Sequence, residues 1–325
     1  MFIDKRCSEQ NYFAREKIRL FCIILEKNVY LCRQMDLTKK YYIVAGHTFS
    51  VSAKESDFAL MTNYEPFVCE GDKAVFTLSV GDGLPVAFTE DMRQEEEGQE
   101  IVCGKTAKGE PVFEFNWWQK TMGNTNRPAG WLVCSTDYRE GRLVVVDGPQ
   151  RKLAIDNALM VLYVLATADK ATVLFHAAAV SHEGRGYMFL GKSGTGKSTH
   201  ASLWVRHIKG AELVNDDNPV VRDGVVYGSP WSGKTPCYRN VSYPLGGIVL
   251  LSQAQYNKIE PLKGLKAYVT LVSSISGMRW DTRIADGLHE TENKLASTVP
   301  IWQLECLPDK GAAELCQLKM KNCDY

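Results

Sequence analysis

The chain has 325 residues, with 38 Lys and Arg against 38 Asp and Glu, and 45% of its residues are apolar. These values are typical of a globular protein and exclude a disordered, collagen-like or coiled-coil chain. Because the net charge is zero, we expect neither nucleic acid nor a membrane as the principal partner. The longest unbroken apolar run, residues 158–166, is far shorter than the roughly 20 residues of a membrane span.

Ten cysteines are scattered along the chain without a CxxC pair, the spacing typical of zinc knuckles and redox dithiols. The N-terminus does not resemble a signal peptide, because Glu16, Lys17 and Arg19 interrupt its apolar residues. We therefore expect reduced, mostly buried thiols and a cytoplasmic protein.

The first half of the chain divides into two segments. Residues 1–40 mix charges with short apolar pieces and contain a second methionine, Met35, so we expect a weakly attached extension or a start codon assigned too early. Residues 41–150 contain short β-rich runs between turns, which predict a mostly β N-terminal domain. Within that domain we expect residues 92–100 to form a solvated acidic loop. The tryptophans of residues 116–131 are expected to cover a small sheet, with a ligand platform as the alternative.

Residues 151–325 have the alternation of an α/β domain. The apolar spacing of residues 151–168 predicts a helix that is apolar nearly all round, hence buried, and we expect it between the two domains. The further elements that we expect are strands near residues 171–175, 177–180, 187–190, 246–251 and 299–306, helices over 265–275 and 284–296, and a last helix from Asp309.

The sequence GKSGTGKST at residues 191–199 matches the phosphate-binding pattern G-x-x-x-x-G-K-[ST]. A predicted strand precedes it and a predicted helix follows it, which is the context that this loop requires. Glycines let the backbone approach a phosphate and direct N–H groups at it, and the helix N-terminus adds positive potential. Lys197 would reach the β- and γ-phosphates and the Ser198 hydroxyl would bind Mg²⁺. The predicted nucleotide-binding residues are Gly191, Lys192, Ser193, Gly194, Thr195, Gly196, Lys197, Ser198 and Thr199.

Two carboxylates follow about twenty residues later, where the predicted strand of AELVNDD ends in Asp216 and Asp217. Carboxylates at the end of a strand beside a phosphate-binding loop hold Mg²⁺ or activate a nucleophile, and an adjacent pair can divide these tasks. A predicted hairpin with Asp223 and Gly224 at its turn follows. It would return the segment PWSGK, which ends at Lys234, to the side of the sheet that carries the acidic pair. There the Lys234 ammonium would contact the γ-phosphate. The alternative is that Lys234 is a surface lysine with no role in the site.

His176 ends a predicted strand fifteen residues before Gly191. If the strands form one sheet, its ring lies within reach of the acidic pair and can orient or tune a carboxylate. The histidines for which we expect only structural roles are His47, His182, His200, His207 and His289.

The set His176, GKSGTGKST, NDD and PWSGK resembles the HPr kinase/phosphorylase-like branch of the P-loop proteins, which is related to phosphoenolpyruvate carboxykinase. The resemblance implies a P-loop kinase core with a mixed sheet, and ATP-dependent phosphoryl transfer to a hydroxyl of a protein, a peptide or a small molecule. It also implies Mg²⁺ on Ser198 and Asp216, with Asp217 as the base toward the acceptor hydroxyl. His176 would correspond to the family histidine that precedes the loop.

Two alternatives remain open at this point. The shared loop form also allows carboxykinase-like chemistry on an oxaloacetate-type substrate. The second alternative is a non-catalytic nucleotide-binding module whose β domain recognises a partner. Neither the glycine-rich signature that follows the core of HPr kinases nor their catalytic arginine is found in this chain, which leaves the acceptor open. The resemblance further implies a homo-oligomer.

Overall fold

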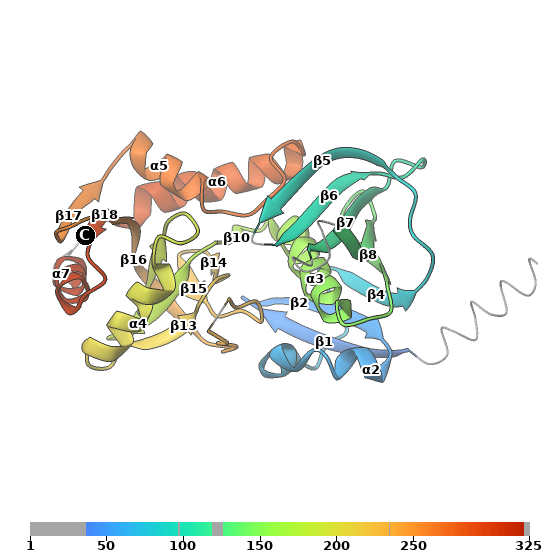
Figure 1. Cartoon of the computed structure of the whole chain (residues 1–325), viewed down its shortest axis with the longest axis horizontal. Helices are drawn as coiled ribbons and strands as arrows, with labels where there is room; N and C mark the ends of the chain where they lie inside the picture. Colours follow the sequence, from blue (N-terminus) through green and yellow to red (C-terminus); the bar gives the residue numbers. More distant parts are fainter. Residues whose placement is uncertain (1–36, 97, 119–125, 234, 322–325) are drawn as a thin grey trace, which may run out of the picture.

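The computed structural model describes residues 37–96, 98–118, 126–233 and 235–321. The chain is a mixed α/β protein with two mixed sheets of nine strands each and several helices (Figure 1). The expected extension lies outside the described residues, apart from its last few positions. In the part of the chain that is described, no helix has both the length and the apolar character needed to cross a membrane.

The first sheet has the order β3-β1-β2-β4-β9-β8-β7-β6-β5. Its neighbours are antiparallel except for β2–β4 and β4–β9. A short helix α2 (Glu55–Phe58) and a 3₁₀ helix η1 (Thr62–Phe67) connect β2 to β3. The strands are β1 (Thr38–Val44), β2 (His47–Ala53), β3 (Val68–Cys69), β4 (Thr77–Asp82), β5 (Thr89–Glu96), β6 (Gln99–Lys105), β7 (Pro111–Trp118), β8 (Asn126–Cys134) and β9 (Glu140–Val145).

The prediction of a solvated acidic loop at residues 92–100 is wrong for most of this segment, because residues 92–96 belong to β5 and residues 99 and 100 to β6, with Gly98 in the turn between them. Arg93 donates to Glu90 at 2.7 Å and to the buried Glu100 at 2.9 Å, and Glu100 also accepts from Asn116 at 2.9 Å. These bonds give Glu90 and Glu100 hydrogen-bond partners, so the ladder between β5 and β6 forms despite the low strand propensity of Glu. Trp131, in contrast, covers the sheet as expected and is buried among valines.

Helix α3 (Arg151–Thr167) confirms the helix predicted over 151–168. It packs on β7, β8 and β9 of the first sheet and on β10 of the second, and Figure 1 shows it on the concave side of the curved first sheet. One continuous apolar cluster includes α3 and the facing residues of both sheets. The helix therefore joins the two halves of the described chain, which is the position expected from its apolar surface.

The second sheet has the order β10-β14-β15-β16-β12-β11-β13. Strand β18 also pairs with β16, and β17 pairs with β18. The pairs β12–β16 and β16–β18 are parallel and the others are antiparallel. The strands are β10 (Thr172–Leu174), β11 (Ala178–His182), β12 (Arg185–Leu190), β13 (Glu212–Asn215), β14 (Val220–Arg222), β15 (Val225–Tyr227), β16 (Ser242–Gln253), β17 (Lys258–Leu262) and β18 (Ile301–Cys306).

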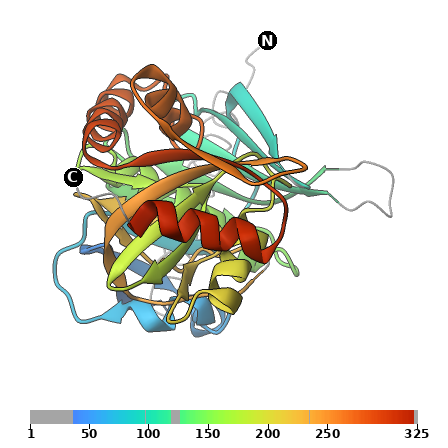
Figure 2. The same ribbon diagram turned by 90° about the vertical axis from the view of Figure 1, so that its left-hand side faces the viewer.

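Helices cover both faces of this sheet. Leu190 of β12 belongs to the cluster that contains α5 (Leu265–Val272) and α6 (Thr282–Thr298), whereas its neighbour Phe189 belongs to the cluster of α4 (Lys197–His207) and α7 (Lys310–Lys321). Alternating residues of a strand point to opposite faces, so each helix pair covers one face. Figure 2 shows the pair α5–α6 standing apart from the red helix α7. The helices predicted at these positions are confirmed, with boundaries shifted by a few residues.

Four strands end at one edge of the second sheet. In the ladder, Leu190 lies beside Leu250, and Leu250 beside Gln303, so β12, β16 and β18 run in the same direction. Strand β11 lies antiparallel between β12 and β13, with Ala179 opposite Asn215, so β13 also ends at this edge. The segments that follow these strands meet here.

Candidate active site

The glycine-rich loop connects the end of β12 to the start of α4. Gly191, Gly194 and Gly196 have φ angles of 151°, 78° and 107°, values that favour glycine. A Cβ on Gly191 would also lie 3.2 Å from the side chain of Thr195. Thr195 in turn donates its N–H and its hydroxyl to the carbonyl of Lys192, at 3.1 and 2.5 Å. The motif glycines are therefore required by the backbone of the loop.

The N-terminus of α4 is open. Gly196 occupies the N-cap position, and no side chain of the described residues caps the helix there. The N–H groups of the first turn have no partner within the helix, and the helix dipole adds positive potential. Lys192, Ser193 and Gly194 are exposed at the tip of the loop, while Ser198 is half-buried and Thr199 exposed in the first turn. This arrangement is suited to an anion such as phosphate.

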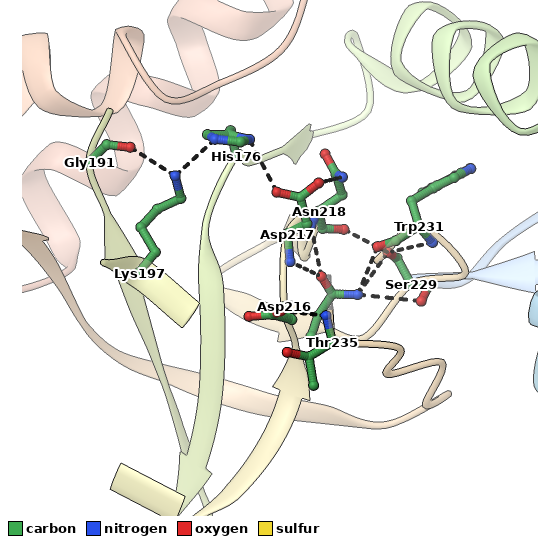
Figure 3. A network of polar contacts seen from close by, with 10 residues as sticks. His176, Gly191, Lys197, Asp216, Asp217, Asn218, Ser229, Trp231 and Thr235 are labelled. Carbon is green, nitrogen blue, oxygen red and sulfur yellow. Dashed lines mark hydrogen bonds and ion pairs between the residues drawn. The ribbon is translucent and has the colours of Figure 1, made fainter. Parts of the chain in front are cut away.

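Lys197 folds back over its own loop. Its buried side chain donates to the carbonyl of Gly191 at 3.1 Å, and its Nζ lies 2.8 Å from Nε2 of His176 (Figure 3). Because an ammonium group can only donate, Nε2 of His176 accepts this bond. The ring proton of a neutral His176 then lies on Nδ1.

His176 connects the lysine to the acidic pair. Its Nδ1 lies 3.4 Å from Oδ1 of Asp217, and both side chains are about one-third exposed. The backbone fixes this position, since His176 donates its N–H to Ser274 at 2.8 Å and Ala177 donates to the carbonyl of Asp217 at 2.8 Å. The expectation that His176 lies within reach of the acidic pair is confirmed. Lys197, His176 and Asp217 thus form one chain of contacts.

Asn215 holds the acidic pair in place. Its side-chain oxygen accepts the N–H groups of Asp217 and Asn218 at 2.9 and 2.7 Å, which bends the chain directly after β13. Its amide nitrogen donates to Ser229 Oγ at 3.1 Å and to the carbonyl of Trp231 at 3.0 Å. No role is predicted for Asn215 from the sequence, although an Asn before two aspartates is typical of a turn.

Asp216 is buried and uses one carboxylate oxygen to accept the N–H of Thr235 at 3.0 Å. The other predicted metal ligand, Ser198, lies in the first turn of α4 and is half-buried. Both supply oxygen, the donor that Mg²⁺ prefers, and Mg²⁺ usually takes only one or two protein ligands beside substrate phosphates. The residues fit this ion, although no group of three or more His, Cys, Asp or Glu side chains in the described ranges could hold a metal by itself.

The segment after β15 returns to the acidic pair as predicted. Asp223 and Gly224 have φ angles of 50° and 75°, the backbone of a two-residue hairpin turn. A Cβ on Gly233 would lie 2.9 Å from the carbonyl of Asp216 and 3.1 Å from Cβ of Asp217. Lys234 itself lies outside the described residues. Its two neighbours in sequence, Gly233 and Thr235, both contact the acidic pair.

The first half of the chain also contacts the site. Tyr64 of η1 accepts the indole N–H of Trp231 at 2.9 Å, and Asn63 donates to the carbonyl of Pro230 at 2.9 Å. Burial raises the pKa of Tyr64 well above its usual value, so the hydroxyl stays neutral. No local pattern in the sequence indicates these contacts, because the partners lie 167 residues apart.

His200 has the structural role that we expected for it. It accepts the indole N–H of Trp204 at 3.2 Å and packs edge-on against Phe189, with ring centroids 4.7 Å apart. Burial lowers its pKa to about 4, which keeps the ring neutral. The histidine of the site is therefore His176.

No protein-family model matches the chain, and neither does any curated protein. The interpretation of the site therefore depends on its geometry. At one sheet edge, the fold gathers an open helix N-terminus, a buried lysine, oxygen donors suited to Mg²⁺ and a His–Asp pair. Such a site can bind a polyphosphate and accept a proton beside it.

Proposed function

We propose that the chain is a Mg²⁺- and ATP-dependent phosphotransferase with a P-loop kinase core of the HPr kinase-like type. It would transfer the γ-phosphoryl group to a hydroxyl of a protein, a peptide or a small molecule. The observation that carries the proposal is the contact chain from Lys197 through His176 to Asp217. It links a phosphate-binding lysine to a group that can take a proton.

The fold supports the phosphate-binding part of this proposal. Strand β12 lies beside the parallel strand β16, and the glycine-rich loop leaves its carboxyl end for the N-terminus of α4. In open α/β sheets this edge is where ligands bind. The loop N–H groups and Lys197 would hold the β- and γ-phosphates.

Each residue of the site has a task in the proposed transfer. Asp217 accepts the proton of the acceptor hydroxyl, whose oxygen forms the new bond to the γ-phosphorus while the bond to the β–γ bridging oxygen breaks. The ring of His176, with Nδ1 3.4 Å from Oδ1 of Asp217, would hold the carboxylate in its direction. Lys197 compensates charge on the departing ADP. When bound by Ser198 and Asp216, Mg²⁺ would neutralise negative charge on the phosphates.

The experiment is phosphoryl transfer from ATP to candidate acceptors, with product detection by mass spectrometry. The acceptors are peptides with Ser or Thr, proteins encoded by neighbouring genes, and small alcohols. We expect Asp217→Asn to lower turnover by about 10²–10⁴-fold, the usual contribution of a general base, and to leave ATP affinity nearly intact. Lys197→Ala should weaken ATP binding. Asp72→Asn is the matched control, because it makes the same change at an exposed aspartate in the first half of the chain. It should change neither turnover nor ATP affinity.

The two alternatives predict other results. Wild-type protein that binds ATP but phosphorylates no acceptor, with Asp217→Asn behaving like wild type, would indicate a binding module. Nucleotide-dependent decarboxylation of oxaloacetate in the presence of Mn²⁺ would indicate carboxykinase-like chemistry. Either result contradicts the proposal.

A further inference from the structure

The linker between α5 and α6, residues 273–281, holds the backbone of His176. The carbonyl of Ser274 accepts the N–H of His176 at 2.8 Å, and Ser276 donates its N–H to the carbonyl of Leu174 at 2.9 Å. These two bonds form an antiparallel bridge between the linker and the end of β10. The position of the site histidine therefore depends on a segment that lies far from it in the sequence.

A carboxylate of α6, that of Glu292, anchors this linker. It is fully buried, and the chemistry proposed above does not use it. Arg279 of the linker donates to its two oxygens at 2.6 and 3.3 Å, and the hydroxyl of Tyr268 on α5 donates to it at 3.2 Å. Because a buried carboxylate without a partner is strongly unfavourable, Glu292 keeps the guanidinium of Arg279 in place.

The guanidinium of Arg279 also closes the linker on itself. It donates to the carbonyl of Val272, the last residue of α5, at 3.1 Å. The Arg279–Glu292 pair is therefore a clamp that joins the end of α5, the linker and α6 through one planar group. Within the linker, Gly277 lies so close to Leu288 of α6 that a Cβ would clash with it. The two helices lie side by side on one face of the second sheet (Figure 1), so the linker has little room to move.

The clamp reaches the site only through the backbone of the linker. In the described part of the chain, neither Arg279 nor Glu292 has a hydrogen bond or an ion pair with His176. The ring of His176 has one nitrogen 2.8 Å from Nζ of Lys197 and the other 3.4 Å from Oδ1 of Asp217. A shift of the histidine backbone would therefore change both distances.

We infer that Arg279, held by Glu292, is a positioning residue for His176. It fixes the linker whose Ser274 carbonyl holds the backbone of the histidine, and so sets the distances from the ring to its two partners. The consequence for phosphoryl transfer rests on the function proposed above, whereas the effect on the histidine backbone does not.

Amide hydrogen exchange of the full chain, followed by NMR, tests the effect on the backbone. Arg279→Met removes the guanidinium and keeps a long side chain. We expect the protection of the His176 and Ser276 amides to fall about tenfold or more relative to the amides of β12. Arg93→Met is the matched control, because Arg93 also donates to a buried glutamate, Glu100, but on the first sheet. It should leave the relative protection of both amides unchanged.

Arg279→Lys takes the place of the methionine variant if that variant does not fold. A lysine keeps a positive charge beside Glu292 but lacks the planar fork that reaches the carboxylate and the carbonyl of Val272 together. We therefore expect a smaller loss of protection at the same two amides. If Arg279→Lys is the only variant that folds, wild-type protection at both amides contradicts the inference.

The phosphotransferase assay tests the consequence for the site. Arg279→Met should lower kcat about 10- to 100-fold, the scale of a small misplacement of a site group, and leave KM for ATP nearly unchanged. In a chain that already carries His176→Gln, the same substitution should cause no further loss, because the two residues act through one contact. Arg93→Met should leave kcat at the wild-type value.

The outcomes separate this inference from the proposed function. If Arg279→Met lowers protection equally at all amides, β12 included, or leaves His176 and Ser276 as in the wild type, the clamp contributes to stability alone and the inference is wrong. Losses of kcat that add to those of His176→Gln would also contradict it. If the amide result holds but wild-type protein phosphorylates no acceptor, the proposed function fails and the positioning of His176 stands.

Discussion

Asn215 fixes the direction of two aspartates from a fully buried position, without belonging to the surface of the site. We expect Asn215→Ala to cost about 1–3 kcal/mol of stability, because buried partners lose their hydrogen bonds. Phosphoryl transfer should lose kcat while KM for ATP changes little, since the glycine-rich loop is untouched. Asn215→Asp keeps the two bonds from the backbone N–H groups and should recover part of kcat. Equal losses in both variants, or a rise in KM alone, would contradict this positioning role.

His47 links the two sheets and makes the stability of the chain depend on pH. It donates from Nε2 to Thr172 at 2.8 Å, since the Thr172 hydroxyl itself donates to Lys170. Burial, followed by the charge of Arg222, lowers the pKa of His47 from 6.5 to about 4. Above pH 6.5 both states are neutral. As the pH falls from 6.5 to 4 the unfolded chain takes up the proton and the folded chain does not, so stability is lost across this window.

The comparison with His47→Gln isolates this contribution, because all other groups titrate in both proteins. Between pH 6.5, where the unfolded histidine is half protonated, and pH 5 the wild type should lose about 1.5 kcal/mol more than the variant, because the slope approaches about 1.4 kcal/mol per pH unit only below pH 6.5. Urea denaturation at several pH values measures the difference. Parallel stability curves for the two proteins would show that His47 is protonated in the folded state.

Residues of the site differ in how well the sequence predicts them. The loop glycines and Lys197 belong to a contiguous pattern, and His176 and the acidic pair lie next to strand ends that the sequence indicates. Asn63 and Tyr64 contact the segment of Trp231 only because the first half of the chain packs there. Such a contact depends on tertiary structure and leaves no local signal.

At the scale of elements, two turns offer a controlled test of the glycine-rich loop. Gly194 and Gly184 have φ angles of 78° and 75°, and a Cβ on either would meet nothing within 4 Å. Alanine at each position should therefore cost a similar amount, about 1–2 kcal/mol, from backbone strain alone. Only Gly194→Ala should also weaken binding of ATP and tripolyphosphate, because it redirects the loop N–H groups. Equal affinities in the two variants would mean that the loop does not contact the ligand.

Elements with strong periodicity were predicted well and the acidic hairpin was not. Helix α3 and the strand–loop–helix of β12 and α4 follow from apolar spacing and glycine placement. Strand β5 contains few apolar residues, and its ladder depends on Arg93 and on the neighbouring strand β6. Its pairing is decided by the sheet rather than by its own residues.

At the scale of the molecule, one apolar cluster spans both sheets, so we expect the two halves to unfold together. Leu162 of α3 is fully buried and packs toward β9. Leu162→Ala should lower the free energy of unfolding by about 2–5 kcal/mol. Hydrogen exchange followed by mass spectrometry should show β9 and β12 losing protection at the same urea concentration. Two separate transitions would show that the sheets are independent.

The pattern of apolar runs and turns indicates strands and helices, but the order of the strands cannot be predicted from local patterns. The sequence marks β11, β12 and β13 as strands, and nothing in it shows that β11 lies between the other two. That arrangement depends on the register of long-range pairs, which local propensity does not encode.

Strand β11 acts as a spacer between the two chemical halves of the site. With one step on either side of it, the end of β12 and the end of β13 are about 10 Å apart. The ladder fixes the distance between the glycine-rich loop, which follows β12, and the acidic pair, which follows β13. In the proposed phosphotransferase, a change of acceptor can therefore evolve on the β13 side while the loop after β12 stays the same.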